Sequence, residues 1–511
     1  MREYTEIEKV RLSKMEALRA RGEEPYPNRV HRTHTVAEAA AAYEAAIQEG
    51  TDTHDSGVAV TLCGRIRSIR TMGKSAFAHV EDGAGKLQLY IRADEVGAEA
   101  LKTFEANYDL GDFLQAEGVM FKTKTGELSL RVKSFRMLAK GISPLPAAKE
   151  QIVDGERKVY SAFDNPEARY RERYADLAVN PEVRDIFRTR AQMISSLRRF
   201  LDANGFLEVE TPILQPLYGG AHARPFTTMH NTYDQMLYLR ISFELYLKRL
   251  VIGGLDRVYE IGRDFRNEGV SKKHNPEFTM LEVYQAYADF EDMMALTEQL
   301  VAHAAERTLG TTRLGRDGQT LELAPPWPRL KLADLIREHS GVDILRATDL
   351  EALRAAVKEA RVPGVEPGVA TTWAGLVDDV FSETVEPKLV QPTFVIEYPA
   401  ALSPLAKREP GRPQMVERFE PFIGGMEIGN AFSELNDPDD QRARFLDQAD
   451  AARRGDLEAE PLDEDFLRAL EYGMPPTGGL GVGIGRLAMI LTGASHLREV
   501  KLFPHLRPRD D

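Results

Sequence analysis

Cysteine, tryptophan and long apolar runs are all scarce in this sequence. Its 511 residues include one cysteine, Cys63, and two tryptophans. A single cysteine allows no disulfide within the chain, which fits a reducing cytoplasm, and it allows no cysteine metal cluster. No apolar run is long enough to span a membrane, and residues 1–27 read as a short amphipathic helix rather than a signal peptide. We therefore expect a cytoplasmic protein with no membrane partner.

Positive charge is also in deficit. Lysine and arginine number 66 against 80 aspartates and glutamates, which leaves a net charge of −14. This balance argues against a protein that coats nucleic acid, so we expect no DNA partner, although it leaves room for a local basic surface. A chain of this length suits two or three domains with an ample core.

Short strands follow a helical, alanine-rich beginning. Strand-like segments lie at about 58–70, 75–82, 86–93, 112–123 and 128–138, and a helical piece at 93–107 separates the third from the fourth. This order is typical of an OB-fold barrel. The barrel would be basic, although a solvated strand face is the better explanation for any single cation; the cations are Arg65, Arg67, Arg70, Lys74, Lys122, Lys124, Arg131 and Lys133.

The domain limits follow from these shifts in pattern. We expect an N-terminal helical extension over 1–56, the OB-fold domain over 57–141, a linker over 142–175 and an α+β domain over 176–511. Within the last domain, a stretch of helices and loops at about 310–390 contains proline and glycine clusters and is interpreted as an insertion.

One segment, FRNEGVSKKHNPEF at 265–278, concentrates charge between two strand-like runs. After it the chain alternates between a face with Thr279, Leu281 and Val283 and a face with Phe278, Met280, Glu282 and Tyr284. The first face suits a core. Glu282 lies among aromatic and apolar neighbours on the second face, which resembles the lining of a pocket. We interpret the segment as a clamp for a charged substrate, with a solvated hairpin tip as the alternative.

A second segment, PPTGGLGVGIGRLAMILTG at 475–493, is rich in glycine. Its glycines at 479, 481, 483 and 485 fall on one strand face at period two, which would let a flat ligand approach the backbone closely. Arg486 then opens an apolar helix. The spacing fits neither a dinucleotide-binding fingerprint nor a phosphate-binding P-loop. A bulged structural strand is the alternative, and it explains four glycines less well than one or two.

A third segment, RFEPFIGGMEIGNAFSELND at 418–437, spaces Glu420, Glu427 and Glu434 among apolar residues and glycines. Carboxylates that face inward need cations, either a metal ion or a substrate ammonium. A helix would put Glu427, Asn430 and Glu434 on one face, but the glycines between them oppose a helix here.

These segments, in this order, resemble the signature motifs of the class II aminoacyl-tRNA synthetases. NGFLEVETPIL at 204–214 resembles the first motif, the charged segment with its flanks the second, and the glycine-rich segment the third. With RISFELYLKRL and YPAALSPLAK the pattern is close to the bacterial lysyl-tRNA synthetases over nearly the whole chain. The resemblance implies an α+β fold, with an antiparallel-sheet catalytic domain and an N-terminal OB-fold anticodon domain, in a homodimer. It implies lysine, ATP and tRNA(Lys) as substrates, with Mg²⁺ as cofactor.

The resemblance also implies roles for single residues of the ATP site. Arg266 and Arg486 resemble the two catalytic arginines of the family. By this resemblance Arg266 holds the α-phosphate and the amino-acid carboxylate, and Arg486 holds the γ-phosphate. Glu268, His274 and Asn275 resemble nucleotide contacts, and Phe278 resembles the plate under adenine. Glu420 and Glu427 resemble Mg²⁺ ligands, and Glu427 is also assigned to ATP.

The lysine pocket and the anticodon site follow by the same resemblance. Lysine carries two ammonium groups and one carboxylate, so its pocket should supply several carboxylates and few cations. Glu434 and Tyr284 resemble the partners of the ε-ammonium, and Glu244 with Gly220 those of the α-amino group. The remaining pocket residues by this resemblance are Glu282, Asn430 and Phe432. Arg70, Phe77 and Gln88 resemble the residues that read uridine-rich anticodon bases.

Four positions depart from the family pattern. Gly485 stands where an acidic residue is usual, Phe243 where proline is common, His222 where alanine is common and Met426 where arginine is common. The alternative functions are an aspartate- or asparagine-tRNA ligase of the same subclass, a catalytically impaired RNA-binding paralogue, and an enzyme that transfers lysine to a translation factor. The glutamate-rich pocket disfavours the first, the two motif arginines disfavour the second, and the N-terminal barrel disfavours the third.

Overall fold

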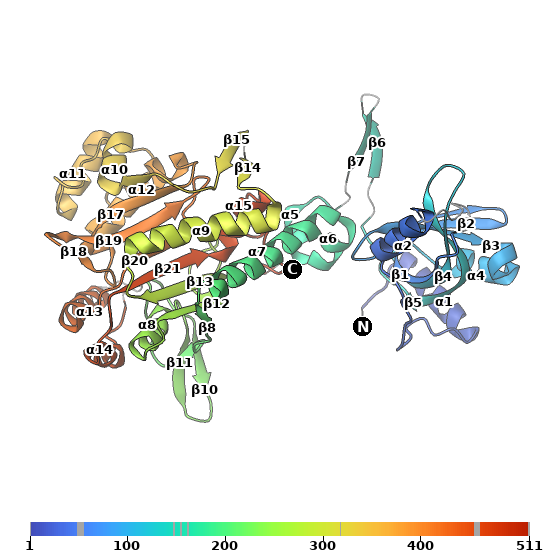
Figure 1. The fold of residues 1–511 in the computed structure, drawn as a ribbon, viewed down its shortest axis with the longest axis horizontal. Helices are drawn as coiled ribbons and strands as arrows, with labels where there is room; N and C mark the ends of the chain where they lie inside the picture. Colours follow the sequence, from blue (N-terminus) through green and yellow to red (C-terminus); the bar gives the residue numbers. More distant parts are fainter. Residues whose placement is uncertain are drawn as a thin grey trace. The chain divides into compact units, whose positions relative to one another are not determined.

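The computed structural model describes residues 2–48, 56–146, 149–153, 156–160, 163–316, 318–453 and 460–508. The chain divides into two compact units, Met1–Asp164 and Asn165–Asp511, whose elements are labelled in Figure 1. Each unit is described by itself. No helix among the described residues is long and apolar enough to cross a membrane.

The first unit contains a closed five-stranded barrel in the order β1-β2-β3-β5-β4. Its strands are β1 (Ala59–Met72), β2 (Ser75–Glu81), β3 (Lys86–Arg92), β4 (Phe113–Lys122) and β5 (Leu128–Ala139). β3 and β5 pair in parallel, and the other pairs are antiparallel. Between β3 and β4, the predicted helix is split into α3 (Ala93–Val96) and α4 (Ala98–Asn107) by Gly97, whose φ is 90°. The predicted OB-fold strand order is confirmed.

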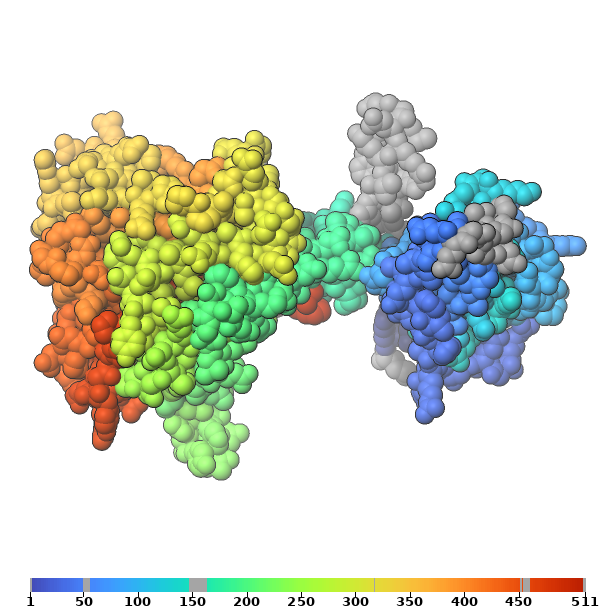
Figure 2. Space-filling view, in the orientation of Figure 1, coloured from blue at the N-terminus to red at the C-terminus, as the bar shows by residue number. Residues whose placement is uncertain are grey.

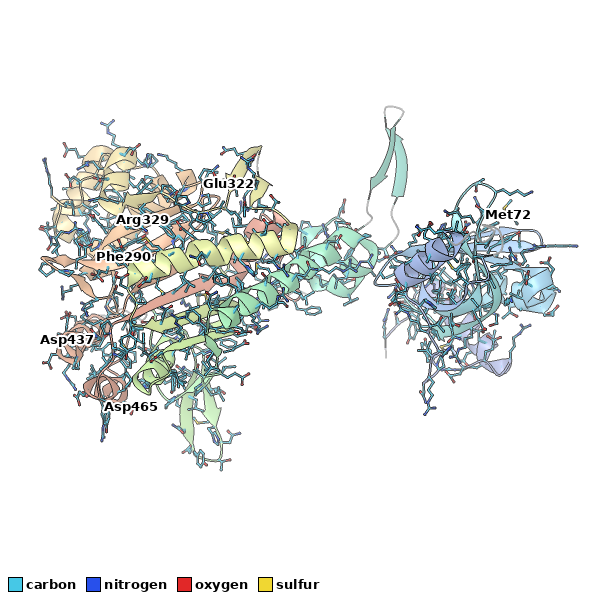
Figure 3. All side chains as sticks on the ribbon, in the orientation of Figure 1. Met72, Phe290, Glu322, Arg329, Asp437 and Asp465 are labelled. Atoms are coloured by element: carbon cyan, nitrogen blue, oxygen red, sulfur yellow. The ribbon has the colours of Figure 1, made fainter. Side chains whose placement is uncertain are left out.

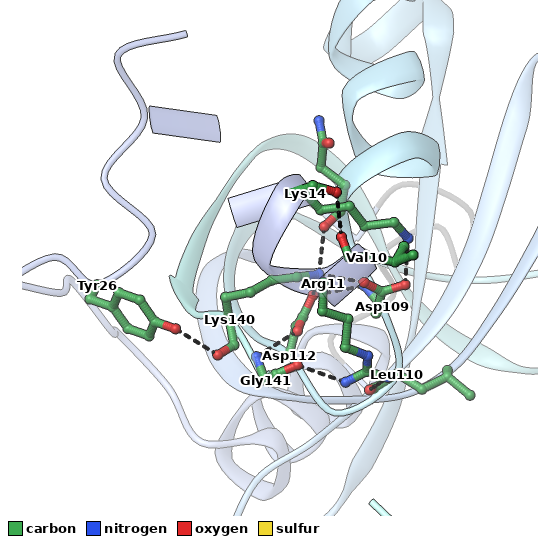
Figure 4. A network of polar contacts seen from close by, with 11 residues as sticks. Val10, Arg11, Lys14, Tyr26, Asp109, Leu110, Asp112, Lys140 and Gly141 are labelled. Carbon is green, nitrogen blue, oxygen red and sulfur yellow. Dashed lines mark hydrogen bonds and ion pairs between the residues drawn. The ribbon is translucent and has the colours of Figure 1, made fainter. Parts of the chain in front are cut away.

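Two helices before the barrel share its core. They are α1 (Glu6–Ala20) and α2 (Val36–Gln48), and they bury Leu18 and Tyr43 beside the inward residues of the strands. Figure 4 shows the polar contacts that fix α1: the Arg11 guanidinium donates to the carbonyl oxygens of Gly141, at 2.7 Å, and of Leu110, at 3.1 Å. Later in this unit, β6 (Lys149–Val153) and β7 (Glu156–Tyr160) pair antiparallel within the stretch expected as a linker.

The second unit is built on a large, mainly antiparallel sheet in the order β16-β17-β19-β20-β21-β13-β12-β8, with β18 paired to β19. The β16–β17 and β12–β8 pairs are parallel. These strands are β8 (Leu207–Glu208), β12 (Arg257–Phe265), β13 (Glu277–Ala286), β16 (Arg329–Lys331), β17 (Thr393–Pro399), β18 (Arg408–Glu409), β19 (Arg412–Phe422), β20 (Gly429–Ser433) and β21 (Thr477–Gly483).

One face of this sheet is covered by α7 (Pro181–Ala203), α9 (Phe290–Leu309) and α15 (Ile484–Thr492), as Figure 1 shows. Leu281, Val283, Leu480 and Val482 point from the strands into this core, as the alternation in the sequence predicted. Helix α15 begins at Ile484, so the predicted glycine face ends at Gly483 and Gly485 lies in the helix. The prediction of four glycines on one strand face is therefore wrong for the last of them.

The remaining elements of this unit lie on both faces and at the edges of the sheet; β15, for example, adds Leu321 to the core of the first face. Figure 2 shows the hairpin of β10 and β11 standing out from the body of the unit. The 310–390 stretch contains strands as well as the expected helices. The elements are α5 (Pro166–Arg171), α6 (Arg173–Val179), β9 (Leu214–Gln215), β10 (Thr227–His230), β11 (Gln235–Leu239), α8 (Glu244–Ile252), β14 (Arg313–Arg316), β15 (Gln319–Glu322), α10 (Leu332–Ser340), α11 (Leu350–Ala360), α12 (Trp373–Thr384), η1 (Glu386–Lys388), η2 (Ala400–Leu402), α13 (Pro438–Arg453) and α14 (Glu464–Glu471).

Candidate active site

Strand register brings distant segments together on the second face of the sheet. The glycine-bearing strand β21 runs between β13 and β20. Glu282 pairs with Gly481, which pairs with Asn430 on the other side. One step along, Tyr284, Gly479 and Phe432 line up in the same way. The glycines thus leave a bare strip of backbone between residues that the sequence analysis assigned to one pocket.

This strip has no room for a side chain at Gly479. A Cβ atom there would lie 1.8 Å from Glu434 Oε1 and 2.8 Å from Tyr284 Cε1. Contacts that short do not occur, so the absence of a side chain lets Glu434 occupy this position. The predicted purpose of the glycines, close approach to the backbone, is met here by a carboxylate of the protein itself.

The charged segment forms the loop between β12 and β13, and one arginine in it lies against an aromatic ring. The Arg266 guanidinium carbon is 5.1 Å from the centre of the Phe278 ring. Arg266 Nε donates to the carbonyl oxygen of Ile241 at 3.3 Å. Asn275 is buried and its Nδ2 donates to the carbonyl oxygen of Glu277 at 2.7 Å. Glu268 is exposed on the same loop.

Arg486, the second predicted catalytic arginine, contacts two other predicted site residues. Arg486 Nη1 is 2.8 Å from Glu427 Oε2, and Arg486 Nη2 is 3.1 Å from His274 Nε2. Burial lowers the pKa of His274, and the Arg486 charge lowers it further. A neutral imidazole can accept a hydrogen bond from the guanidinium through Nε2. Arg486, Glu427 and His274, which are far apart in the sequence, therefore form one cluster.

Glu420, which was predicted to bind Mg²⁺ together with Glu427, has a separate set of hydrogen bonds. Glu420 Oε2 accepts a hydrogen bond from the Tyr398 hydroxyl at 2.7 Å, and Oε1 accepts one from Arg418 Nη2 at 2.5 Å. The pKa of Glu420 is raised to about 7, because burial and the Glu427 charge raise it more than the Arg418 charge lowers it. Arg418 Nε also donates to Asn430 Oδ1 at 2.8 Å.

The predicted lysine pocket is a cluster of buried carboxylates. Glu282 Oε1 accepts a hydrogen bond from Ser242 Oγ at 3.0 Å, and Oε2 accepts one from the Tyr284 hydroxyl at 3.1 Å. Burial, together with the nearby Asp264 and Glu244 carboxylates, raises the pKa of Glu282 to about 8. The structure thus brings Glu244, Glu282, Tyr284 and Glu434 close enough to influence one another electrostatically.

The sequence analysis did not assign three charged residues of this site. Lys248 Nζ lies 2.5 Å from Glu244 Oε1 and also contacts Glu434, so the pocket contains a cation that was not expected. Glu460 Oε2 accepts the Gly220 N–H at 2.9 Å. Asp264, on β12, is fully buried, and its Oδ1 lies 3.4 Å from Nε of the buried Arg240. Of these three, only Lys248 could have been found from the sequence, because a lysine four residues after Glu244 on a helix can pair with it.

A cavity of about 380 Å³ lies next to this pocket. It opens between residues 215–219, α8 and the start of α14, and it shares Ser242 with the surroundings of Glu282. None of the pocket carboxylates Glu244, Glu282 and Glu434 lines it. The carboxylate cluster is therefore distinct from this cavity.

Comparison with known proteins identifies the family. The model of the class II tRNA synthetases (D, K and N) matches residues 165–507, and the model of the OB-fold nucleic acid binding domain matches residues 60–138. The chain belongs to the class II tRNA synthetases. A lysine–tRNA ligase of Chloroflexus aurantiacus is 52% identical over 510 residues, which cover 100% of both chains. A lysine–tRNA ligase of Roseiflexus castenholzii is 50% identical over 509 residues, or 99% of this chain and 100% of the relative. The expected α+β synthetase fold with an N-terminal OB-fold barrel is confirmed.

The synthetase fold gives a packing reason for the unusual glycine before Arg486. Gly485 lies in the first turn of α15, and a Cβ atom on it would lie 2.5 Å from Leu497 Cδ1. Leu497 is 4% exposed and belongs to the main core. In this chain Leu497 therefore fills the space that a side chain at position 485 would need.

Adding a single methyl group at this position should destabilise the synthetase. We expect Gly485→Ala to lower the free energy of unfolding by about 1–3 kcal/mol, because Leu497 must move within a packed core. Thermal or urea unfolding would measure the change. Gly368→Ala is the matched control, since a Cβ there meets no atom within 4 Å; an equal effect of both changes would contradict the packing argument.

The barrel of the synthetase presents an aromatic row flanked by arginines. Phe77 stacks on Tyr90 with 4.7 Å between ring centres, and the Arg70 guanidinium carbon is 5.6 Å from the Phe77 ring centre. Gln88, in contrast, is 4% exposed, and its Nε2 donates to Ser129 Oγ at 2.9 Å. Tyr90 was not predicted, although it follows Gln88 by two residues and so lies on the same strand face. The row suits stacking with the bases of a single strand.

Proposed function

We propose that this chain is a lysine–tRNA ligase. It would activate lysine with ATP to give lysyl-adenylate and pyrophosphate, and then transfer the lysyl group to the 3′ end of tRNA(Lys). The observation that carries the proposal is the cluster of buried carboxylates beside the arginine loop. Buried carboxylates are costly without cationic partners, and a substrate with two ammonium groups supplies such partners. The names of the full-length relatives support the same substrate.

The charge of the pocket also weighs against the other functions. An aspartate or asparagine ligase would have to place a substrate carboxylate or amide among Glu244, Glu282 and Glu434. Among the described residues Lys248 is the cation that pairs with these glutamates, and both of its partners are already carboxylates of the protein. A catalytically impaired paralogue is disfavoured because Arg266 and Arg486 are both in place, each in contact with another predicted site residue. The barrel disfavours an enzyme that modifies a translation factor.

The chemistry of the first step needs positioning more than it needs a nucleophilic side chain. The substrate carboxylate attacks the α-phosphate, and the protein must hold the two groups close together. Arg266 would stabilise the negative charge that develops at the phosphate, and Phe278 would stack under adenine. Arg486, with His274 beside it, would hold the γ-phosphate. Glu268 and Asn275 would contact the nucleotide.

We propose Glu420 and Glu427 as the Mg²⁺ ligands. Mg²⁺ is usually held by one or two carboxylates together with substrate phosphates, so a pair of glutamates suits it. The charge of Glu427 contributes to the raised pKa of Glu420, and such like-charge repulsion is relieved when a divalent cation binds. The ion would neutralise the phosphates and leave the pyrophosphate a better leaving group.

The pocket assignments follow from the same proposal. Glu434 and Tyr284 would bind the ε-ammonium of lysine, and Glu244 with Gly220 the α-amino group. Asn430 and Phe432 would complete the pocket around Glu282. We further propose a cytoplasmic homodimer, with residues 57–141 as the anticodon-binding domain and 176–511 as the catalytic domain. In the first-motif segment, Leu207, Ile213 and Leu214 are between 44% and 51% exposed, and an apolar surface of this kind suits a partner subunit.

Amino-acid-dependent exchange of ATP with pyrophosphate tests the proposal directly. Purified protein would be assayed with each standard amino acid in turn. Exchange with lysine alone is expected. Exchange with aspartate or asparagine would reject the lysine pocket and keep the class of enzyme, whereas no exchange by a folded protein would favour the impaired paralogue.

The anticodon assignment makes a separate prediction. Phe77→Ala should raise the KM for tRNA(Lys) about 10-fold in aminoacylation, because stacking on one base contributes roughly 1–3 kcal/mol. Exchange of ATP with pyrophosphate, which needs no tRNA, should stay unchanged. An unaltered KM for tRNA would remove Phe77 from the RNA surface, and a loss of exchange would indicate damage to the protein as a whole.

A further inference from the structure

Lys248 stands out as a lysine side chain buried inside the pocket proposed for lysine. It lies on α8, four residues after Glu244, and its side chain is 0% exposed. Its Nζ is 2.5 Å from Glu244 Oε1, contacts Glu434 Oε2, and lies 5.6 Å from the centre of the Phe432 ring. A buried ammonium is tolerated only when it is paired, and here it has two carboxylate partners.

The contacts of Lys248 leave one oxygen of Glu434 for another ligand. Lys248 forms an ion pair with Oε2. Both oxygens are buried and accept no hydrogen bond from the described residues, and Oε1 has no ion-pair partner among them either. Oε1 lies over the bare backbone of Gly479. A buried carboxylate oxygen without a donor is costly unless a ligand satisfies it. Its position beside Tyr284 and the glycine strip indicates where a substrate ammonium would lie.

The electrostatic surroundings keep Lys248 charged. Burial alone would lower the pKa of Lys248, but the Glu244 and Glu434 carboxylates together raise it above its usual value. Acidic side chains outnumber this single ammonium; the titratable groups around it are Glu244, Glu282, Tyr284, Glu434 and Glu460. Burial raises the pKa of Glu282 and of Glu434 above the usual value, and a substrate ammonium beside them would favour their ionised forms.

We propose that Lys248 is a positioning residue of the amino-acid pocket. Its ammonium holds Glu244 and Glu434 as oriented carboxylates and leaves Glu434 Oε1 to receive the ε-ammonium of the substrate. The inference rests on the proposed lysine ligase. The opposite reading makes Lys248 a placeholder that occupies the substrate's position, and its removal would then favour lysine binding.

Lys248→Met tests this inference, because methionine is of similar length and carries no charge. Without the internal cation, Glu434 would become protonated more easily. We expect the KM for lysine in ATP–pyrophosphate exchange to rise roughly 10- to 100-fold at pH 7, with the KM for ATP changed less than about twofold. The ratio of variant to parent KM for lysine should shrink as the pH rises above 7 and the carboxylate ionises again. The parent profile supplies the baseline, since Glu282 titrates in this range as well.

Arg249→Met is the matched control. Arg249 follows Lys248 on α8, and both cations lie near the same aromatic ring. The Arg249 guanidinium carbon is 5.3 Å and Lys248 Nζ is 6.0 Å from the centre of the Phe466 ring. The partners of Arg249 are Asp463 and the exposed Asp465 of α14, which Figure 3 labels, rather than the pocket carboxylates. Its loss should change the KM for lysine by less than about twofold.

The outcomes separate cleanly. A rise in the KM for lysine that fades with increasing pH supports the inference. A lower KM for lysine would establish the placeholder instead, and a rise that is independent of pH or equal for ATP would reduce Lys248 to a packing role. If Lys248→Met does not fold, Lys248→Gln is assayed with the same criteria. Failure of the parent protein to exchange with lysine would instead reject the proposed ligase.

Discussion

Replacing Arg266 with alanine is expected to slow adenylate formation by about 10²- to 10³-fold. Removal of one preorganised donor from a developing negative charge typically has an effect of this size. The backbone around Arg266 is well anchored, since its N–H donates to the Pro276 carbonyl oxygen at 2.8 Å, so the loss should be confined to the side chain. Single-turnover formation of lysyl-adenylate, followed by rapid quench, would measure the rate constant separately from the binding of either substrate.

Arg263→Ala provides the comparison for this loss. Arg263 lies on β12, three residues before Arg266, and pairs with Glu277 at 2.6 Å, with both side chains nearly half exposed. Such surface pairs contribute little, so this variant should keep a rate within about twofold of the parent. If Arg266→Ala reacts as fast as Arg263→Ala, the assignment of Arg266 to the α-phosphate fails.

Replacing Glu434 with glutamine should raise the KM for lysine roughly 100-fold and leave the KM for ATP within about twofold. Glutamine keeps the shape of the side chain but removes the charge that would pair with the substrate ε-ammonium, and hydrogen bonds between charged groups contribute about 1.5–3 kcal/mol. Lys248 also loses one of its two carboxylate partners, which adds to the effect. Steady-state exchange kinetics with lysine and ATP varied in turn would give both constants.

The control for Glu434 is a glutamate far from any assigned group. Glu359 is exposed on α11, and Glu359→Gln should change neither KM. Equal increases in both KM values for Glu434→Gln would point to a general disturbance of the site and would end its assignment to the ε-ammonium.

The parts of this molecule that obey a local period could be predicted from the sequence. The barrel strands and the two faces of β13 follow from alternation, and the core positions Leu281 and Val283 were read from it. The helix start at Ile484 was missed because glycines at period two continue past the end of the strand. Packing of Gly485 against Leu497 involves residues from separate elements, so no local pattern reveals it.

The site was predictable only as far as the family resemblance carried it. Glu282 and Glu434 are joined by the register of β13, β21 and β20, which no spacing along the chain encodes. Glu460 enters from the segment before α14 through a hydrogen bond to the Gly220 amide. The positions of such residues depend on tertiary packing, and tertiary packing leaves no periodic pattern in the sequence from which they could be predicted.

The contact between Arg486 and Glu427 has a thermodynamic consequence. Their side chains pair at 2.8 Å, and the Arg486 guanidinium also donates to the Glu427 carbonyl oxygen at 2.9 Å. In the proposed roles one of them meets a phosphate and the other a divalent cation. A nucleotide that drew Arg486 away would release Glu427 for the cation, and a cation held by Glu427 would leave Arg486 available for the nucleotide. Each ligand then lowers the cost of binding the other, and by linkage the two effects are equal in free energy.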